Sequence, residues 1–505
     1  MLSKITSFAL RGLEGIPVEV ETDINKGMVS CDIVGLPDTA VKESKERVRS
    51  AIKNSALIFP VNKITINLAP ADVKKEGSHY DLPLAVSILK ASGQLSANFD
   101  GTVLLGELAL DGSLRPAEGI LPVLISARSK GFKRFVIPAG NRGEASFIDG
   151  AEVYALNTLK EVVEFLQGEK TFEPVKARSY ASVRKAQTYN CDMSLVKGQA
   201  AAKRAIEIAV AGGHNILLVG PPGSGKTMLA RCIPTIMPDL TFEEALEVTK
   251  ILSVSGELPE DGIVTLRPFR TPHHTATTVS LCGGGSGKIR AGEISKAHNG
   301  VLFLDELPEY HRSTLEALRQ PLEDGVITVT RAGASVTFPA DFILCASMNP
   351  CPCGNYGSAK HVCKCTPAQI LRYRSRVSGP LLDRIDLHIE ADGVVYDELI
   401  SEAAAETSAE IRSRVERARQ IQRERFQGED MRVNSNMGER QIKKYCRLSA
   451  ESENILRGAF ESLNLSARAR SRIIKVARTI ADLDGSADIQ PKHILEAASY
   501  RSAGL

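Results

Sequence analysis

Residues 215–233 read NILLVGPPGSGKTMLARCI, and this stretch decides which kind of fold the chain can adopt. An apolar run, Ile216 to Val219, enters a segment that matches G-x-x-x-x-G-K-[ST] and then opens into a helical pattern. The motif predicts a strand, a loop that wraps nucleotide phosphates with backbone N–H groups, and a helix. Lys226 is expected to neutralise the β- and γ-phosphates, and the Thr227 hydroxyl to coordinate Mg²⁺. The predicted cofactor-binding residues are Gly220, Pro221, Pro222, Gly223, Ser224, Gly225, Lys226 and Thr227.

A second apolar run ends in two acidic residues. Residues 299–310, NGVLFLDELPEY, predict a strand that delivers Asp305 and Glu306 to its carboxyl end. Asp305 is expected to hold Mg²⁺, and Glu306 to polarise the attacking water as a general base. Such a run alone equally fits a buried strand followed by surface acids. Because the phosphate-binding motif lies about eighty residues earlier, the pair predicts a Mg²⁺-dependent ATPase.

Two further polar residues, Asn349 and Arg384, follow these two motifs along the chain. Residues 342–350, FILCASMNP, predict a third apolar strand that ends at Asn349, and residues 379–390, GPLLDRIDLHIE, contain Arg384. An Asn at a neighbouring strand end can hold the lytic water, and an Arg offered across a subunit boundary can stabilise charge on the γ-phosphate. By spacing alone, each also fits an ordinary turn Asn or surface Arg.

Length and composition indicate a globular chain of about three domains. Of its 505 residues 43% are hydrophobic and 24% charged, and the net charge of +3 excludes a histone-like polycation. We expect an α/β domain at 1–170, a basic linker at 171–190, a second α/β domain at 191–392 and a helical domain at 393–505. The sequence has neither a signal peptide nor an apolar window of membrane-spanning length, which predicts a cytoplasmic protein with no membrane partner.

Four of the ten cysteines fall within residues 349–366, NPCPCGNYGSAKHVCKCT. The spacing C-x-C, nine residues, C-x-C allows the thiolates of Cys351, Cys353, Cys363 and Cys365 to converge. Structural Zn²⁺ is the favoured interpretation in a reducing compartment, and His361 could replace one cysteine. Free buried thiols and a redox or disulfide role stay open as alternatives.

The order of these motifs resembles AAA+ ATPases of the magnesium-chelatase and minichromosome-maintenance-helicase clade, and within it the ComM/YifB family. The resemblance rests on residues 196–227, 268–285, 291–310 and 465–485, and it covers essentially the whole chain. It implies that Asn349 is sensor 1, Arg384 the arginine finger and Arg468 sensor 2. It also implies a homo-oligomer, a hexameric ring with ATP bound between subunits, and a C-terminal helical lid.

Two segments match elements that line the central pore of related helicases. Residues 326–331 and 335–338 predict a hairpin before sensor 1, with Arg331 beside its tip, and a plain surface hairpin is the alternative. The second element is a loop with Gly283 to Gly285 and the cations Lys288 and Arg290, although Ala291 stands where the family commonly has Pro. The three cations are the DNA-contact candidates. The adjacent His273 and His274 are expected to point apart on an extended segment, which disfavours a metal site there.

The first domain resembles the Lon-protease fold, of the ribosomal S5 type. Peptidases of that fold use a Ser-Lys dyad. Here Ser78 lies one residue early, His79 occupies the nucleophile position, and Val123 stands where the Lys is needed. We therefore expect a noncatalytic module that builds a ring or lines a DNA channel.

Together these features predict an ATP-driven, ring-shaped DNA helicase with ATP, Mg²⁺ and structural Zn²⁺ as cofactors. The resemblance implies branch migration of single-stranded or branched DNA in homologous recombination, including integration of transforming DNA. The alternatives are the motor subunit of a metal chelatase and a chaperone-like remodelling ATPase. An ATP-dependent protease is opposed by the missing dyad, and a nonenzymatic scaffold by the complete ATPase set.

Overall fold

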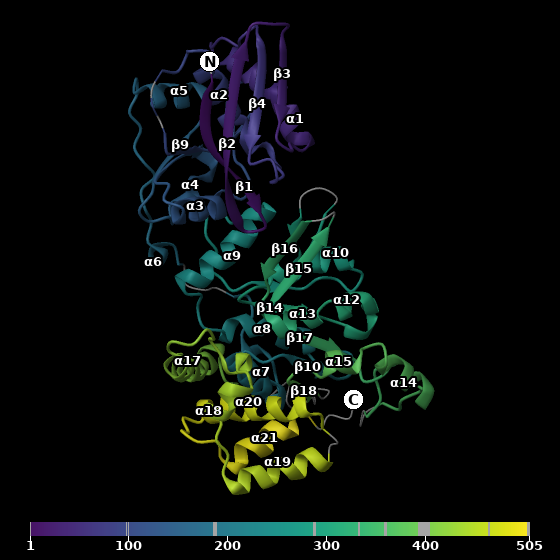
Figure 1. The fold of residues 1–505 in the computed structure, drawn as a ribbon. Helices are drawn as coiled ribbons and strands as arrows, with labels where there is room; N and C mark the ends of the chain where they lie inside the picture. Colours follow the sequence, from purple (N-terminus) through teal and green to yellow (C-terminus); the bar gives the residue numbers. More distant parts are fainter. Residues whose placement is uncertain are drawn as a thin grey trace.

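A computed structural model describes residues 2–96, 98, 100–184, 189–285, 289–331, 334–357, 361–391, 405–462 and 465–501. Three parts follow one another along a long axis (Figure 1): an N-terminal sheet with helices, a central parallel sheet, and a C-terminal group of helices. This arrangement confirms the predicted α/β class with a helical C-terminal region. The domain boundaries and the Lon-protease resemblance stay predictions.

The N-terminal part is a seven-stranded sheet with the order β3-β4-β2-β1-β5-β8-β9. Alternation makes one face of each strand apolar: in β4, Ile64, Ile66 and Leu68 are buried while the residues between them are not. The strands are β1 (Ser3–Arg11), β2 (Glu14–Asn25), β3 (Ser30–Val34), β4 (Lys63–Ala69), β5 (Thr102–Leu104), β8 (Arg134–Pro138) and β9 (Glu152–Leu156), with a small hairpin of β6 (Glu107–Leu108) and β7 (Leu114–Arg115). The helices are α1 (Thr39–Asn54), α2 (Asp81–Ala91), α3 (Ile120–Ser129), α4 (Arg142–Ala145), α5 (Leu159–Gln167) and α6 (Tyr180–Val183).

The central sheet consists of five parallel strands in the order β11-β14-β17-β10-β18. Its three middle strands are buried at every position, as expected for a parallel sheet covered on both faces. The strands are β10 (Ile216–Val219), β11 (Phe269–Arg270), β14 (Val301–Leu304), β17 (Ile343–Met348) and β18 (Leu387–Glu390). Because the strands are parallel, the chain leaves β10, β14 and β17 at the same edge, where the three predicted nucleotide motifs meet.

Helices and two hairpins surround this sheet. The hairpins pair β12 (Gly283–Gly284) with β13 (Arg290–Ala291), and β15 (Val326–Arg331) with β16 (Ala334–Pro339), so both predicted loop elements start from short antiparallel ladders. The helices are α7 (Ala200–Gly212), α8 (Lys226–Ile236), α9 (Phe242–Ser255), α10 (Thr278–Cys282), α11 (Glu293–Lys296), α12 (Arg312–Glu316), α13 (Arg319–Asp324), α14 (Pro367–Arg374) and α15 (Gly379–Leu382). The segment between β17 and α15, which contains α14, extends outward from the central part (Figure 1).

The C-terminal helices share one apolar core with the central part. Residues of α7, α8, α17 and α20 belong to the same buried cluster. The helices are α17 (Ser408–Arg425), α18 (Glu439–Tyr445), α19 (Ala450–Ser462), α20 (Ala467–Leu483) and α21 (Pro491–Ser499). No helix in the described ranges is both long enough and apolar enough to cross a membrane.

Among the described residues, the N-terminal and central parts touch at several places, including α9 and the β1–β2 turn. At α9, the Ser253 hydroxyl donates a hydrogen bond of 2.8 Å to the buried Glu144, and burial raises the pKa of that carboxyl. At the β1–β2 turn, a Cβ on Gly12 would lie 2.5 Å from Cγ1 of Val336 on β16, and φ there is +65°. Only glycine fits this turn without strain, and the turn thereby lies directly against the β15–β16 hairpin.

Candidate functional site

The phosphate-binding loop lies between β10 and α8. Gly223 and Gly225 have positive φ angles of 77° and 84°, which the loop needs in order to turn its N–H groups inward. Gly220 is confined, because a Cβ there would lie 2.2 Å from the carbonyl oxygen of Ala391. The helix α8 begins at Lys226, so its N-terminal N–H groups and dipole are directed at the loop.

Lys226 lies over this loop with its ammonium group buried. Nζ donates to the carbonyl oxygens of Gly220 at 2.7 Å and Pro221 at 2.8 Å, and it lies 3.4 Å from Oδ1 of Asn349. Burial lowers its pKa from the ordinary value. The amine thus occupies a pre-formed cradle, to which a phosphate would bring compensating negative charge.

Thr227 and Asp305 meet at the sheet edge. The Thr227 hydroxyl donates a hydrogen bond of 2.9 Å to Oδ2 of Asp305, and the Ser347 hydroxyl donates a hydrogen bond to Oδ1 of the same carboxylate. A hydroxyl and a carboxylate side by side are the oxygen ligands that Mg²⁺ uses next to nucleotide phosphates. The two predicted magnesium residues are therefore adjacent.

Glu306, the next residue, has a left-handed backbone conformation with φ +53°. Its N–H donates a hydrogen bond of 3.0 Å to Oδ1 of Asp305. Its carboxylate is 57% exposed and lies 3.4 Å from Nδ1 of His274. The His273 and His274 rings lie side by side, tilted by 34° with centroids 4.1 Å apart, so the expectation that these side chains point apart is wrong. The reason is a turn: the Thr275 N–H donates to Nδ1 of His273, and the segment is not extended.

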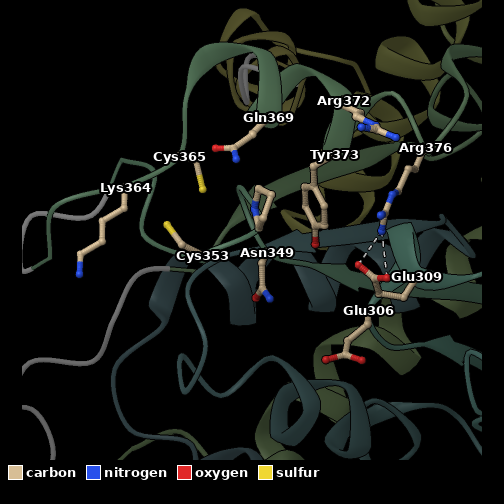
Figure 2. Close-up of a pocket in the computed structure, with 11 residues that line it drawn as sticks. Glu306, Glu309, Asn349, Cys353, Lys364, Cys365, Gln369, Arg372, Tyr373 and Arg376 are labelled. Carbon is tan, nitrogen blue, oxygen red and sulfur yellow. Dashed lines mark hydrogen bonds and ion pairs between the residues drawn. The ribbon is translucent and has the colours of Figure 1, made fainter.

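A cavity of about 870 Å³ opens next to these groups (Figure 2). Asn349 and Glu306 lie on one side of it. Arg376 comes from the opposite wall, and its Nη1 donates to both carboxylate oxygens of Glu309, at 2.8 and 2.9 Å. The other lining residues are Pro352, Cys353, Lys364, Cys365, Gln369, Arg372 and Tyr373. The cysteine segment and α14 thus form one wall of the cavity beside the predicted catalytic residues.

The four cysteines converge as the spacing predicted. Their Sγ atoms all lie within 4.8 Å of one another, and three pairs are 3.4 to 3.7 Å apart. A tetrahedral zinc with Zn–S bonds of about 2.3 Å separates its sulfurs by about 3.8 Å, so the donor set fits that ion. Backbone N–H groups of Asn355 and Lys364 lower the pKa of the Cys353 thiol to about 6, whereas burial raises the pKa of the Cys365 thiol, so only a bound cation would keep all four sulfurs ionised.

Arg384 and Arg468 lie together, at a second cavity of about 730 Å³. Arg384 pairs with Glu323 and donates 2.8 Å to the Pro380 carbonyl, while Arg468 lies 3.6 Å from the other Glu323 oxygen. The residues that line this cavity include none of the loop 220–227, nor Asp305, Glu306 or Asn349. Sequence reasoning gave Glu323 no role, because nothing in its local pattern separates it from a surface acid.

The three DNA-contact candidates are only partly described. Lys288 and the tip residues 332–333 lie outside the described ranges, and for Arg331 only the backbone, at the end of β15, is described. Arg290 is exposed on β13, opposite Gly284. The structure therefore leaves the roles of these cations as predictions.

Family models of magnesium chelatase match three segments of the chain. The family model described as "Magnesium chelatase, subunit ChlI" matches residues 192–399, and "Magnesium chelatase, subunit ChlI C-terminal" matches 405–501. A third model, "Subunit ChlI of Mg-chelatase", matches residues 20–141.

Full-length relatives agree with the family models. The uncharacterised protein YifB of Escherichia coli (strain K12) is 44% identical over 99% of this chain and 97% of its own length. The competence protein ComM of Haemophilus influenzae is 42% identical over the same shares. The maternal DNA replication licensing factor mcm6 of Xenopus tropicalis is 23% identical over 58% of this chain and 33% of its own length.

Proposed function

The chain belongs to the ComM/YifB family of magnesium-chelatase-like AAA+ ATPases, and on that premise we propose that it is a ring-shaped ATPase that translocates and branch-migrates DNA. The observation that carries the ATPase proposal is the meeting of Lys226, Thr227, Asp305, Glu306 and Asn349 at one sheet edge. A metal-chelatase motor and a remodelling ATPase share this edge, so they remain the competing functions.

In the proposed reaction, Lys226 and the loop N–H groups bind the β- and γ-phosphates, and Thr227 and Asp305 hold Mg²⁺, which supplies charge neutralisation when bound. Glu306 accepts a proton from the attacking water, and Asn349 orients that water. The exposed Glu306 carboxylate and the open cavity beside it leave room for the water.

Arg384 and Arg468 serve, in this proposal, the ATP of a neighbouring subunit. Both line the second cavity rather than the first, which supports action across an interface. A homo-oligomeric ring, with a hexamer as the proposed form, would bring the two cavities of adjacent subunits together. Structural Zn²⁺ held by the four cysteines would fix the wall of the first cavity.

DNA is proposed as the partner because of two features. One is the pair of hairpins that extend from the ATPase part, with the predicted cations near their tips. The other is that the Haemophilus influenzae relative is named a competence protein and the Xenopus tropicalis relative a DNA replication licensing factor. Branch migration in homologous recombination, including integration of transforming DNA, is the activity proposed for this chain.

The test is an ATPase assay with single-stranded, duplex and four-way-junction DNA at low salt. We expect stimulation by single-stranded or junction DNA that falls steeply as salt rises, because phosphate counterions are released on binding. Arg290→Ala with Arg331→Ala should keep basal hydrolysis and lose stimulation and junction unwinding. The control is Arg417→Ala, at an exposed arginine of α17 away from both hairpins, and it should keep all three. Hydrolysis with no DNA response and no unwinding would contradict the helicase proposal and favour the chelatase-like or remodelling ATPase.

A further inference from the structure

The segment of residues 351–357 and 361–378, here called the arm, carries three apolar or aromatic side chains that are largely exposed. Val362 is 86% exposed, Leu371 72% and Tyr356 49%. Single exposed apolar residues are ordinary, but three on one projecting segment are typical of an interaction surface (Figure 1).

The arm is held in one conformation by its own contacts. Arg374 donates to the Pro350 carbonyl and places its guanidinium 5.2 Å from the Tyr356 ring centroid. The helix α14 starts with a reciprocal cap between Thr366 and Gln369. A surface that is already ordered loses little entropy when a partner binds.

The arm also lies directly beside the ATP site. A Cβ on Gly354 would come 2.4 Å from Cδ of Pro222 in the phosphate-binding loop. Cys353 and Arg372 line the same cavity as Glu306 and Asn349 (Figure 2). A group of another subunit that enters this cavity would therefore lie near the arm.

The charges of the exposed side chains indicate which surface of a neighbouring subunit would contact the arm. Arg372 is exposed and has no side-chain partner among the described residues. Glu323 is 49% exposed and pairs with Arg384 at the second cavity. If Arg384 of one subunit enters the ATP site of the next, its partner Glu323 would approach the cavity wall that carries Arg372, and opposite charges would face each other.

We propose that the arm is a docking element for a second copy of this chain, with Leu371 against the neighbour's surface around α13 and Arg372 paired with its Glu323. This inference rests on the proposed ring. It assigns the cysteine segment a role in subunit contact, since the four cysteines fix the base from which α14 projects.

The first test is photocrosslinking of the full-length chain with a non-hydrolysable ATP analogue. Leu371 is replaced by p-benzoylphenylalanine, and Leu495, which is 57% exposed on α21, is replaced likewise as a control. We expect a crosslinked dimer from position 371 whose joined peptide contains residues 319–331, and none of that product from position 495. Mass photometry of the wild type establishes whether rings form.

Different results would contradict the proposed ring and the proposed docking of the arm. Wild-type protein that stays monomeric with the ATP analogue would overturn the ring. Rings that form while position 371 crosslinks only within its own chain, or to another region of the neighbour, would overturn the arm proposal and leave the ring intact.

The second test exchanges the charges. Arg372→Glu and Glu323→Lys should each lower ATPase activity about tenfold and weaken ring formation, because like charges then face each other. The double variant should recover at least about threefold over either single variant, and Arg417→Glu should have no effect. Normal rings in the Arg372→Glu variant, or a double variant no better than the worse single one, would overturn the pairing.

Discussion

Lys226 and Glu306 lie at the same site, but replacing them should impair different steps, ATP binding and ATP hydrolysis respectively. Lys226→Ala removes the buried ammonium that bridges Gly220 and Pro221, so ATP binding should be lost. Glu306→Gln keeps the side-chain shape and removes only the base, so ATP should bind normally while turnover falls by about 100-fold or more. Equilibrium binding of a fluorescent ATP analogue and steady-state phosphate release measure the two effects. Near-normal turnover in Glu306→Gln would remove this residue from the role of base.

His274 is expected to position the Glu306 carboxylate. Its Nδ1 lies 3.4 Å from that carboxylate, and its ring is held by His273 and, edge-on, by Tyr310. His274→Ala should lower kcat by about fivefold with unchanged ATP affinity, and His274→Gln, which can still donate a hydrogen bond, should restore most of it. The exposed His311 provides the matched control, His311→Ala. Equal losses in the Ala and Gln variants, or a loss of ATP affinity, would indicate a merely structural role.

The sequence predicts site residues that belong to a local motif. It misses site residues that reach the site only through tertiary contacts. Lys226, Thr227 and Asp305 belong to motifs, and the structure brings them together. Ser347 and His274 reach Asp305 and Glu306 only because strands and loops distant in sequence are adjacent in the fold. The prediction that the His273 and His274 side chains point apart was wrong because the backbone turns at Thr275. The hydrophobic periodicity of the sequence gives no sign of that turn.

Among the elements, the strands of the central sheet are the most predictable. A fully apolar run is what a strand covered on both faces requires, and β10, β14 and β17 each have one. The hairpin at 326–339 was also predictable from its β-branched residues. Its contact with the β1–β2 turn was not, because Gly12 gives no sign of its partner Val336 more than three hundred residues away.

The cysteine segment is an element whose stability should depend on metal. We expect the purified chain to contain about one zinc ion, and Cys351→Ser with Cys363→Ser to lose it. Since Gly354 packs on Pro222, metal loss should also weaken ATP binding, by about threefold or more. Elemental analysis, thiol titration and ATP affinity are the measurements, with the distant Cys31→Ser as the control. Metal-free protein with four reactive thiols and unaltered ATP affinity would exclude the zinc site.

For the whole molecule, the decisive feature is that the two expected arginines lie at a different cavity from the phosphate-binding loop. In the proposed ring, each chain would then contribute to two ATP sites, with its phosphate-binding loop at one and its arginines at the other. The motif order alone could not predict the separate cavities, because spacing along the chain does not state which side of the sheet Arg384 faces. Glu323, which pairs with Arg384 and lies near Arg468, offsets part of the positive charge of these two arginines within one chain.

A mixing experiment tests this division. Lys226→Ala chains lack a working ATP site but retain Arg384, and Arg384→Ala chains retain the ATP site but lack the arginine. Each variant alone should be almost inactive. In rings assembled at random from equal amounts, about a quarter of the interfaces join an intact loop to an intact arginine, so activity should recover to as much as about a quarter of wild type. Mass photometry of tagged chains verifies that the rings are mixed. Verified mixed rings without recovery would argue that Arg384 acts on the ATP of its own chain or has no role in hydrolysis, and would contradict the proposed action across the interface.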